Sequence, residues 1–163
     1  MADLNFAGSY DGLHLPYSPE AEQAVLGAII LESNTFDKVV DTLKSPDYFY
    51  VSLHKLIFAQ MQEMVGLGLN IDFVTLLERL KQNKAFDEST GKSYLFDLVD
   101  NCPSISNAEE YAKIIAEKYN VRRLITASRE IIDDATAGNE DPSVLIDSAE
   151  QKIFDIRQGN ERH

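Results

Sequence analysis

The chain has 163 residues, one cysteine and a formal net charge of −12. This length accommodates one domain with a proper core, or a domain with an appendage, but not a further nucleotide-hydrolysing domain. Because nucleic-acid binding relies mainly on Lys and Arg contacts to phosphates, so acidic a chain is not expected to bind DNA or RNA directly. The three histidines lie far apart and Cys102 stands alone, so no metal site is predicted either. With no disulfide framework, no leader and no long uncharged apolar run, we expect a cytoplasmic protein that does not cross a membrane.

The N-terminal residues divide into an arm and a first helix. Residues 1–16 show no periodicity and no helix cap, so they are expected to form a flexible arm. Ser18 is a good N-cap and Pro19 a good first helical residue, while Glu20 and Glu22 suit the positive end of the helix dipole. The following residues are apolar on most sides of a helix that runs to residue 31, which places this helix at the centre of the core. These residues are Val25, Leu26, Ile29 and Ile30.

Four further segments show helical spacing of apolar residues between residues 36 and 99. The first ends before Pro46, the second has Ser52 as its expected N-cap, and the third has Asp72. No alternating β-branched run of strand length occurs, so the chain is predicted to be all-α. The apolar positions are Phe36, Val39, Val40 and Leu43; Leu53, Ile57, Met61 and Met64; Phe73, Leu76, Leu77 and Leu80; and Tyr94, Leu95, Leu98 and Val99.

The fourth segment contains Gly91-Lys92-Ser93, the last three residues of a phosphate-binding loop. Such a loop also requires a glycine five residues earlier, and that position is Phe86. The four intervening residues add two negative charges where phosphates would have to lie. We therefore expect a loop that leads into a helix, with Gly91 at or near its N-cap and residues 92 and 93 in its first turn.

A long helix and a shorter one follow. Ser106 and Glu109 fit a capping box, and the helical pattern then continues to about Ala137, where Gly138 ends it. Asp141 and Pro142 begin a second helix that runs to about residue 158. The connection between them is so short that the two helices must lie antiparallel, and the second can pair only with the half of the first from residue 120 onward.

This predicted hairpin has more apolar surface than two helices can hide from each other. Val121, Leu124 and Ile131 share one stripe of its first helix, and Ile125 and Ile132 share another. The second helix adds Ile146 and Ile153. Each large apolar group left in water costs about 1.5–3 kcal/mol, so the surface is covered either by the globular part of the chain or by a partner. A partner chain is the favoured interpretation.

Five segments in this order closely resemble the N-terminal domain of bacterial DnaB-type replicative DNA helicases. They are SPEAEQAVLGAIIL (18–31), DYFYVSLHKLIFAQM (47–61), IDFVTLLERL (71–80), GKSYLFDL (91–98) and AEEYAKIIAEKYNVRRLITAS (108–128). The resemblance implies a globular helical head followed by a helical hairpin, which agrees with the division from periodicity. We therefore expect a flexible arm at 1–16, the head at 17–106, the antiparallel hairpin at 107–158, and the start of a linker or tail at 159–163. It covers nearly all of residues 16–157, but none of the motor that follows in such helicases.

The resemblance also implies what the domain does. In this family the hairpins and heads assemble into a collar, and the outer surface docks the C-terminal domain of primase at the replication fork. Here the implied partner-binding residues are Glu20, Tyr94, Arg122, Ile125 and Ile131. The self-association residues, taken from the surplus apolar stripes of the hairpin and expected to pack in a dimer or a hexameric collar, are Val121, Leu124, Ile132, Ile146 and Ile153.

Alternatives accompany these expectations. Tyr94 is equally compatible with the core, Glu20 is an ordinary first-turn acid, and Arg122 fits either a partner carboxylate or solvated surface. His54 is expected to be a structural residue near a helix start rather than an acid or base. No catalytic residue, metal or cofactor is expected, since ATP and Mg²⁺ belong to the absent motor. A stand-alone regulator that binds primase or a helicase loader, and a small nucleotide hydrolase that uses Lys92, are the other functions considered.

Overall fold

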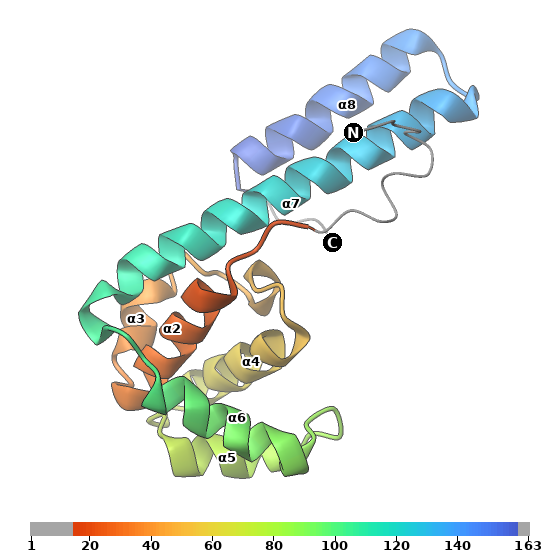
Figure 1. Ribbon diagram of the computed structural model, residues 1–163. Coiled ribbons are helices and arrows are strands. Elements are labelled where there is room, and N and C mark those ends of the chain that lie inside the picture. The colour runs from red at the N-terminus through yellow and green to blue at the C-terminus, as the bar shows by residue number, and fades with distance from the viewer. Residues whose placement is uncertain (1–14, 160–163) are drawn as a thin grey trace, which may run out of the picture. The chain divides into compact units, whose positions relative to one another are not determined.

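The computed structural model describes residues 15–159, and every regular element in this range is helical, which confirms the all-α prediction (Figure 1). Nearly all of the expected flexible arm, and the last four residues of the expected tail, lie outside the described residues. The elements are α2 (Pro19–Leu31), α3 (Thr35–Val39), the 3₁₀ turn η1 (Pro46–Tyr48), α4 (Ser52–Gly66), α5 (Phe73–Lys81), α6 (Glu88–Asp100), the 3₁₀ turn η2 (Ile105–Asn107), α7 (Ala108–Ala137) and α8 (Pro142–Arg157).

Packing contacts divide the described residues into two units. The head unit spans Tyr17–Tyr119, and the hairpin unit contains residues 120–159 together with residues 15 and 16. The sequence placed the end of the head at residue 106, whereas the division by contacts falls inside α7. The first turns of α7 therefore belong to the head, where Ala108, Ala112 and Ile115 are buried in its core.

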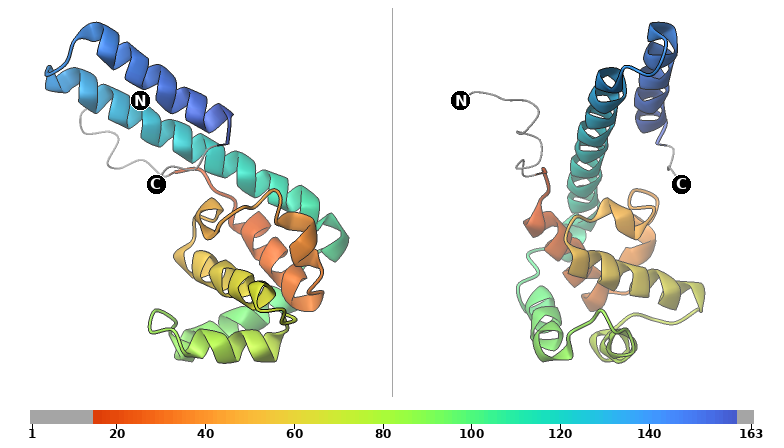
Figure 2. Two further views of the ribbon diagram at one scale, coloured as in Figure 1. Left: turned by 180° about the vertical axis from the view of Figure 1, so that it is seen from behind. Right: turned by 90° about the vertical axis from the view of Figure 1, so that its right-hand side faces the viewer.

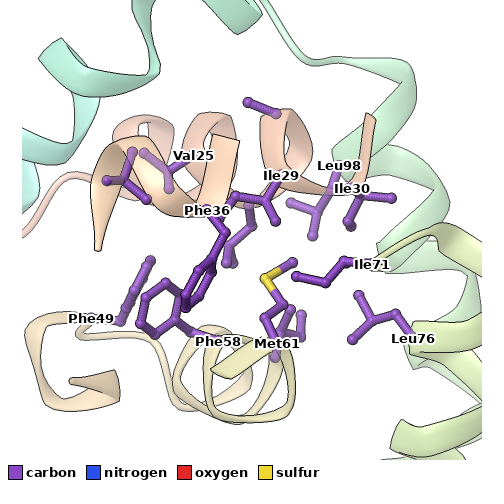
Figure 3. Packing of buried hydrophobic residues seen from close by; sticks show 14 of the residues in the cluster. Val25, Ile29, Ile30, Phe36, Phe49, Phe58, Met61, Ile71, Leu76 and Leu98 are labelled. Carbon is purple, nitrogen blue, oxygen red and sulfur yellow. The ribbon is translucent and has the colours of Figure 1, made fainter. Parts of the chain in front are cut away.

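Helix α2 lies at the centre of the head core, as its apolar sequence predicted. Figure 3 shows its Val25, Ile29 and Ile30 facing side chains from α4, α5 and α6. Val25, Leu26, Ala28 and Ile29 are fully buried. Because α2 contacts α3, α4, α6 and η2, its removal would leave the other helices of the head without a common surface.

Three predicted N-caps are confirmed by their hydrogen bonds. The Ala21 amide donates to Ser18 Oγ at 3.1 Å, and the Ser143 amide donates to Asp141 Oδ2 at 3.3 Å. Asp72 accepts from the Thr75 amide at 2.8 Å, and the Asp72 amide donates back to Thr75 Oγ1, which completes a capping box. The hydrogen bonds from the Thr75 amide and hydroxyl lower the pKa of Asp72 below its ordinary value.

Two other predicted caps are wrong. Ser52 is the first residue of α4 and Val51 is its N-cap, which has no side-chain acceptor to offer. Ser106 lies inside η2, so it is not the N-cap of α7. In both cases the residues next to the serine did not determine the cap. The N-cap amide of α4 donates to a residue of α2, and α7 is preceded by a tight 3₁₀ turn.

The predicted position of Gly91 is also wrong. Asp87 is the N-cap of α6, so Gly91 and Lys92 lie past its first turn. Gly91 is buried, and a Cβ there would overlap the ring of Phe86. Phe86 is itself only 6% exposed, so its ring occupies the space that any larger residue at 91 would need.

The hairpin unit has the predicted antiparallel form. In both views of Figure 2, α8 runs back beside the C-terminal part of α7. Gly138 ends α7 with φ of 70°, a left-handed conformation that glycine adopts without a steric penalty. Lys152 on α8 reaches two carboxylates of α7, Glu130 at 3.9 Å and Asp134 at 3.8 Å, and is only 14% exposed.

Substitution of Gly91 by Ala tests the contact with Phe86. Gly→Ala inside a helix normally stabilises by about 0.5–1 kcal/mol, but here we expect a loss of about 1–3 kcal/mol because the added methyl overlaps the Phe86 ring. Gly66→Ala in α4 is the matched control, since nothing lies within 4 Å of a Cβ at that position. Urea unfolding measures both, and equal free energies of unfolding for the two variants would contradict the role of Phe86.

Candidate partner-binding site

A buried carboxylate from α2 completes the start of α4. Glu22 is only 1% exposed and accepts from the Tyr50 amide at 2.8 Å and from the Val51 amide at 3.3 Å. Val51 is the N-cap of α4 and Tyr50 precedes it. The N-cap amide is one of the N–H groups that have no partner within a helix, and negative charge is favoured at this end. Glu22 thus satisfies the N-cap amide from a distance, at a helix start where Ser52 was expected to act as the cap.

The sequence assigned Glu22 only a favourable charge in the first turn of α2, so its burial was missed. A signal was present, because Glu22, Val25, Leu26 and Ile29 follow the spacing i, i+3, i+4, i+7 of one helix face. An acid on the most apolar face of a central helix requires a buried partner.

His54 is that partner. It is fully buried, and its Nδ1 lies 2.7 Å from Glu22 Oε1. On the other side of the ring, Nε2 lies 2.6 Å from the Tyr94 hydroxyl oxygen, which also accepts from Gln23 Nε2 at 3.1 Å. The chain of hydrogen bonds therefore joins α2, α4 and α6. The expectation that His54 is a structural residue near a helix start agrees with this position.

Glu20 and Tyr94, which the resemblance implied as partner-binding residues, are brought together in the structure. Both line a pocket between α2 and α6, which we call the α2–α6 groove. Tyr94 is half-buried: its ring packs against the core, while its hydroxyl belongs to the network of His54. The full lining is Glu20, Gln23, Ala24, Tyr94, Asp97, Leu98, Asn101 and Pro103.

The two walls of this groove meet at backbone contact. Gly27 of α2 lies so close to α6 that a Cβ there would overlap the carbonyl oxygen of Leu98. Helices that cross at a glycine approach each other more closely than side chains would allow.

The other three implied partner-binding residues lie in the hairpin unit. Ile125 and Ile131 are half-buried. Arg122 is only 8% exposed, and its Nη1 donates to the Pro16 carbonyl oxygen at 2.9 Å, so the alternative of a solvated surface arginine is wrong. The partner contacts of all five residues stay predictions.

All five residues implied in self-association have side chains exposed to solvent. Ile146 is 59% exposed and lines a pocket formed by residues of α7 and α8, while Ile153 lines a second pocket on α8. The hairpin therefore presents large apolar side chains to solvent, although no second chain is present to test the association. The exposed members are Val121, Leu124, Ile132, Ile146 and Ile153.

Lys92 is not placed for nucleotide chemistry. In a phosphate-binding loop the backbone N–H groups point at the phosphates, but here the Gly91 amide donates to the Asp87 carbonyl at 2.7 Å within the helix. Lys92 is exposed beside Glu88 and Asp97, which would repel a phosphate.

Across residues 15–159 no three His, Cys, Asp or Glu side chains group in a way that could hold a metal ion. Over the same range no helix is both long enough and apolar enough to span a bilayer.

Comparison with known sequences identifies similar proteins. Residues 14–117 match the family described as the DnaB-like helicase N-terminal domain. The chain is 37% identical over 143 residues to the replicative DNA helicase DnaB of Geobacillus stearothermophilus, covering 88% of this chain and 31% of that protein. It is 36% identical over 149 residues to DnaB of Pasteurella multocida, covering 90% of this chain and 32% of that protein. The chain thus spans about a third of the length of these relatives.

Solved structures share the fold. The N-terminal domain of the DnaB helicase of Mycobacterium tuberculosis superimposes with a TM-score of 0.80 at 30% identity, covering 87% of this chain and 99% of that one. A DnaB-like replicative helicase, described together with its interactions with primase, gives a TM-score of 0.70 at 23% identity, covering 85% of this chain and 31% of that one. At that identity the second likeness shows the fold alone.

Substitution of Glu22 by Gln tests the buried carboxylate. We expect the free energy of unfolding to fall by about 2 kcal/mol. The Gln side chain can accept from fewer of the three N–H donors that surround Glu22, and it places its own NH₂ group among them. Glu20→Gln is the matched control two residues earlier, where the side chain is exposed, and should change stability by less than about 0.5 kcal/mol. The capping role fails if both variants unfold at the same urea concentration.

Proposed function

The chain belongs to the family of DnaB-like helicase N-terminal domains, and from this premise we propose that it is a non-catalytic domain of a replicative DNA helicase that assembles subunits into a collar and docks primase. The observation that carries the proposal is the exposed apolar surface of the hairpin unit. Catalysis would belong to the motor of such a helicase, which would use ATP and Mg²⁺ in the cytoplasm.

The apolar surface is present on both helices of the hairpin. Leu124 of α7 is 45% exposed, and Ile146 and Phe154 of α8 are 59% and 51% exposed. Single exposed apolar side chains are normal, but several on one short hairpin form a patch of the kind that mediates protein association. Burial against a second copy would recover about 1.5–3 kcal/mol for each large side chain that becomes fully covered.

Primase docking is supported by the family and by the placement of the implied residues. Glu20 and Tyr94 line one groove of the head unit, and Ile131 lines a pocket of the hairpin unit. A domain that holds primase beside the motor would raise the effective concentration of primase at newly unwound single strands. Its contribution would be positional, because it requires no chemistry from this chain.

Self-association is tested with substitutions on the exposed face of α8. We expect the wild-type chain to form dimers or larger assemblies as its concentration rises, and the double variant Ile146→Asp, Ile153→Asp to raise the dissociation constant at least about tenfold. Each carboxylate would have to be buried in the interface. Sedimentation equilibrium measures the mass, and Val74→Asp, at a 67% exposed position of α5, is the control. A wild-type chain that remains monomeric throughout would contradict the proposal.

Primase docking is tested by titration with the C-terminal domain of primase. We expect Ile125→Asp to weaken binding about tenfold or more, because a charge would enter an apolar contact. Ile114→Asp is the matched control, since Ile114 lies on the same helix, is 38% exposed and is not an implied contact. Circular dichroism checks that both variants keep their helix content. Equal affinity of the two variants would remove Ile125 from the interface.

A further inference from the structure

The α2–α6 groove combines an apolar floor with acidic and polar sides. Ala24 and Leu98 are buried beneath it, while the carboxylates of Glu20 and Asp97 are exposed at its sides. Among the described residues that line the groove, none is basic. An apolar floor flanked by carboxylates, with no basic residue in the lining, is complementary to a Lys or Arg side chain, which has an apolar stem and a cationic end.

The hydrogen-bond network behind the groove determines what the Tyr94 hydroxyl can offer. The Glu22 carboxylate accepts from two backbone amides and lies 2.7 Å from His54 Nδ1, and carboxylate oxygens act as acceptors. With the ring proton on Nδ1, Nε2 is the acceptor for the Tyr94 hydroxyl, whose oxygen lies 2.6 Å away.

The hydroxyl oxygen accepts the Gln23 amide at 3.1 Å, which uses one of its two lone pairs. Its proton points to His54, so the remaining lone pair is the only hydrogen-bonding capacity that Tyr94 has left. The groove therefore has three acceptor groups, namely the carboxylates of Glu20 and Asp97 and the hydroxyl of Tyr94.

We propose that the α2–α6 groove receives one Lys or Arg side chain of the partner protein, and that His54, oriented by Glu22, is a positioning residue that fixes the Tyr94 hydroxyl as an acceptor for it. The inference rests on the proposed function, because the partner protein that supplies this side chain is primase. It adds the chemistry of one subsite and assigns a role to two buried residues that no partner can touch.

The position of Asp97 strengthens the match to a cation. Asp97 and Asn101 lie at the C-terminal end of α6, where the helix dipole is negative and favours positive charge. The stem of the incoming side chain would cover Ala24 and Leu98, and its charged end would reach Asp97 and Glu20. Charge-assisted hydrogen bonds of this kind are about twice as strong as neutral ones.

The charge of the groove is tested by comparing Asp97→Asn with Asp100→Asn in titrations with the C-terminal domain of primase. Both substitutions remove one negative charge from α6, but only Asp97 lines the groove. We expect Asp97→Asn to weaken binding about tenfold and Asp100→Asn to change it less than about twofold. Equal weakening by both variants would show a general charge effect and overturn the cation subsite.

The positioning role is tested by comparing His54→Gln with His54→Met. Both variants lose the ring and its contact with Glu22, but the Gln carbonyl can still accept from the Tyr94 hydroxyl whereas Met offers only a weak acceptor. We expect similar losses of stability but tighter primase binding by the Gln variant. In the wild-type chain, the ¹⁵N signals of the His54 ring should show a proton on Nδ1 and none on Nε2. Equal binding by the two variants, or a proton on Nε2, would overturn the role.

A small probe separates the failure of this inference from failure of the proposed function. If the wild-type chain does not bind primase, the proposed function fails, but the groove is still tested with N-acetyl-arginine methylamide against its neutral citrulline analogue. We expect the arginine probe alone to shift the amide signals of Gln23 and Asn101, and the shifts to disappear in Asp97→Asn. Identical shifts with both probes, or none with either, would overturn the cation subsite.

Discussion

The carboxylate of Glu22 is the group on which the arrangement of the head depends. It lies in the central helix of the core, almost without solvent exposure, and it accepts from two backbone amides at the start of α4 and from the ring of His54. A buried carboxylate is tolerated only when donors surround it, so α2 and α4 can pack in only one register. Through His54 the same group reaches Tyr94, which joins the core to the surface of α6.

Local sequence patterns predicted the helices well. The spacing of apolar residues located the core helices and the hairpin, because a helix that buries one face must repeat apolar residues every three or four positions. The caps at Ser18, Asp72 and Asp141 could also be predicted, since each depends on a hydrogen bond to a residue no more than three positions away. These features are encoded by neighbours in the chain.

Features that depend on distant residues could not be predicted in this way. The bonds of Glu22 span 28–32 residues, the bond of Gln23 to Tyr94 spans 71, and that of Arg122 to Pro16 spans 106. The same limit explains the error at Ser52, where a cap from another helix replaced the local one. The candidate site was therefore predicted only in part: Glu20 and Tyr94 were implied by resemblance, whereas Glu22 and His54 needed the packing of α2 on α4.

The close approach of Gly27 to the Leu98 carbonyl has a consequence for the thermodynamics of binding. Because backbone atoms set the separation of α2 and α6, the width of the groove between them does not depend on side-chain rotamers. A ligand that enters such a preorganised groove loses its own conformational entropy but causes little additional ordering of the receptor, so more of the contact energy is retained as affinity. Glycine at this position would thus favour a recognition surface that binds without reorganisation.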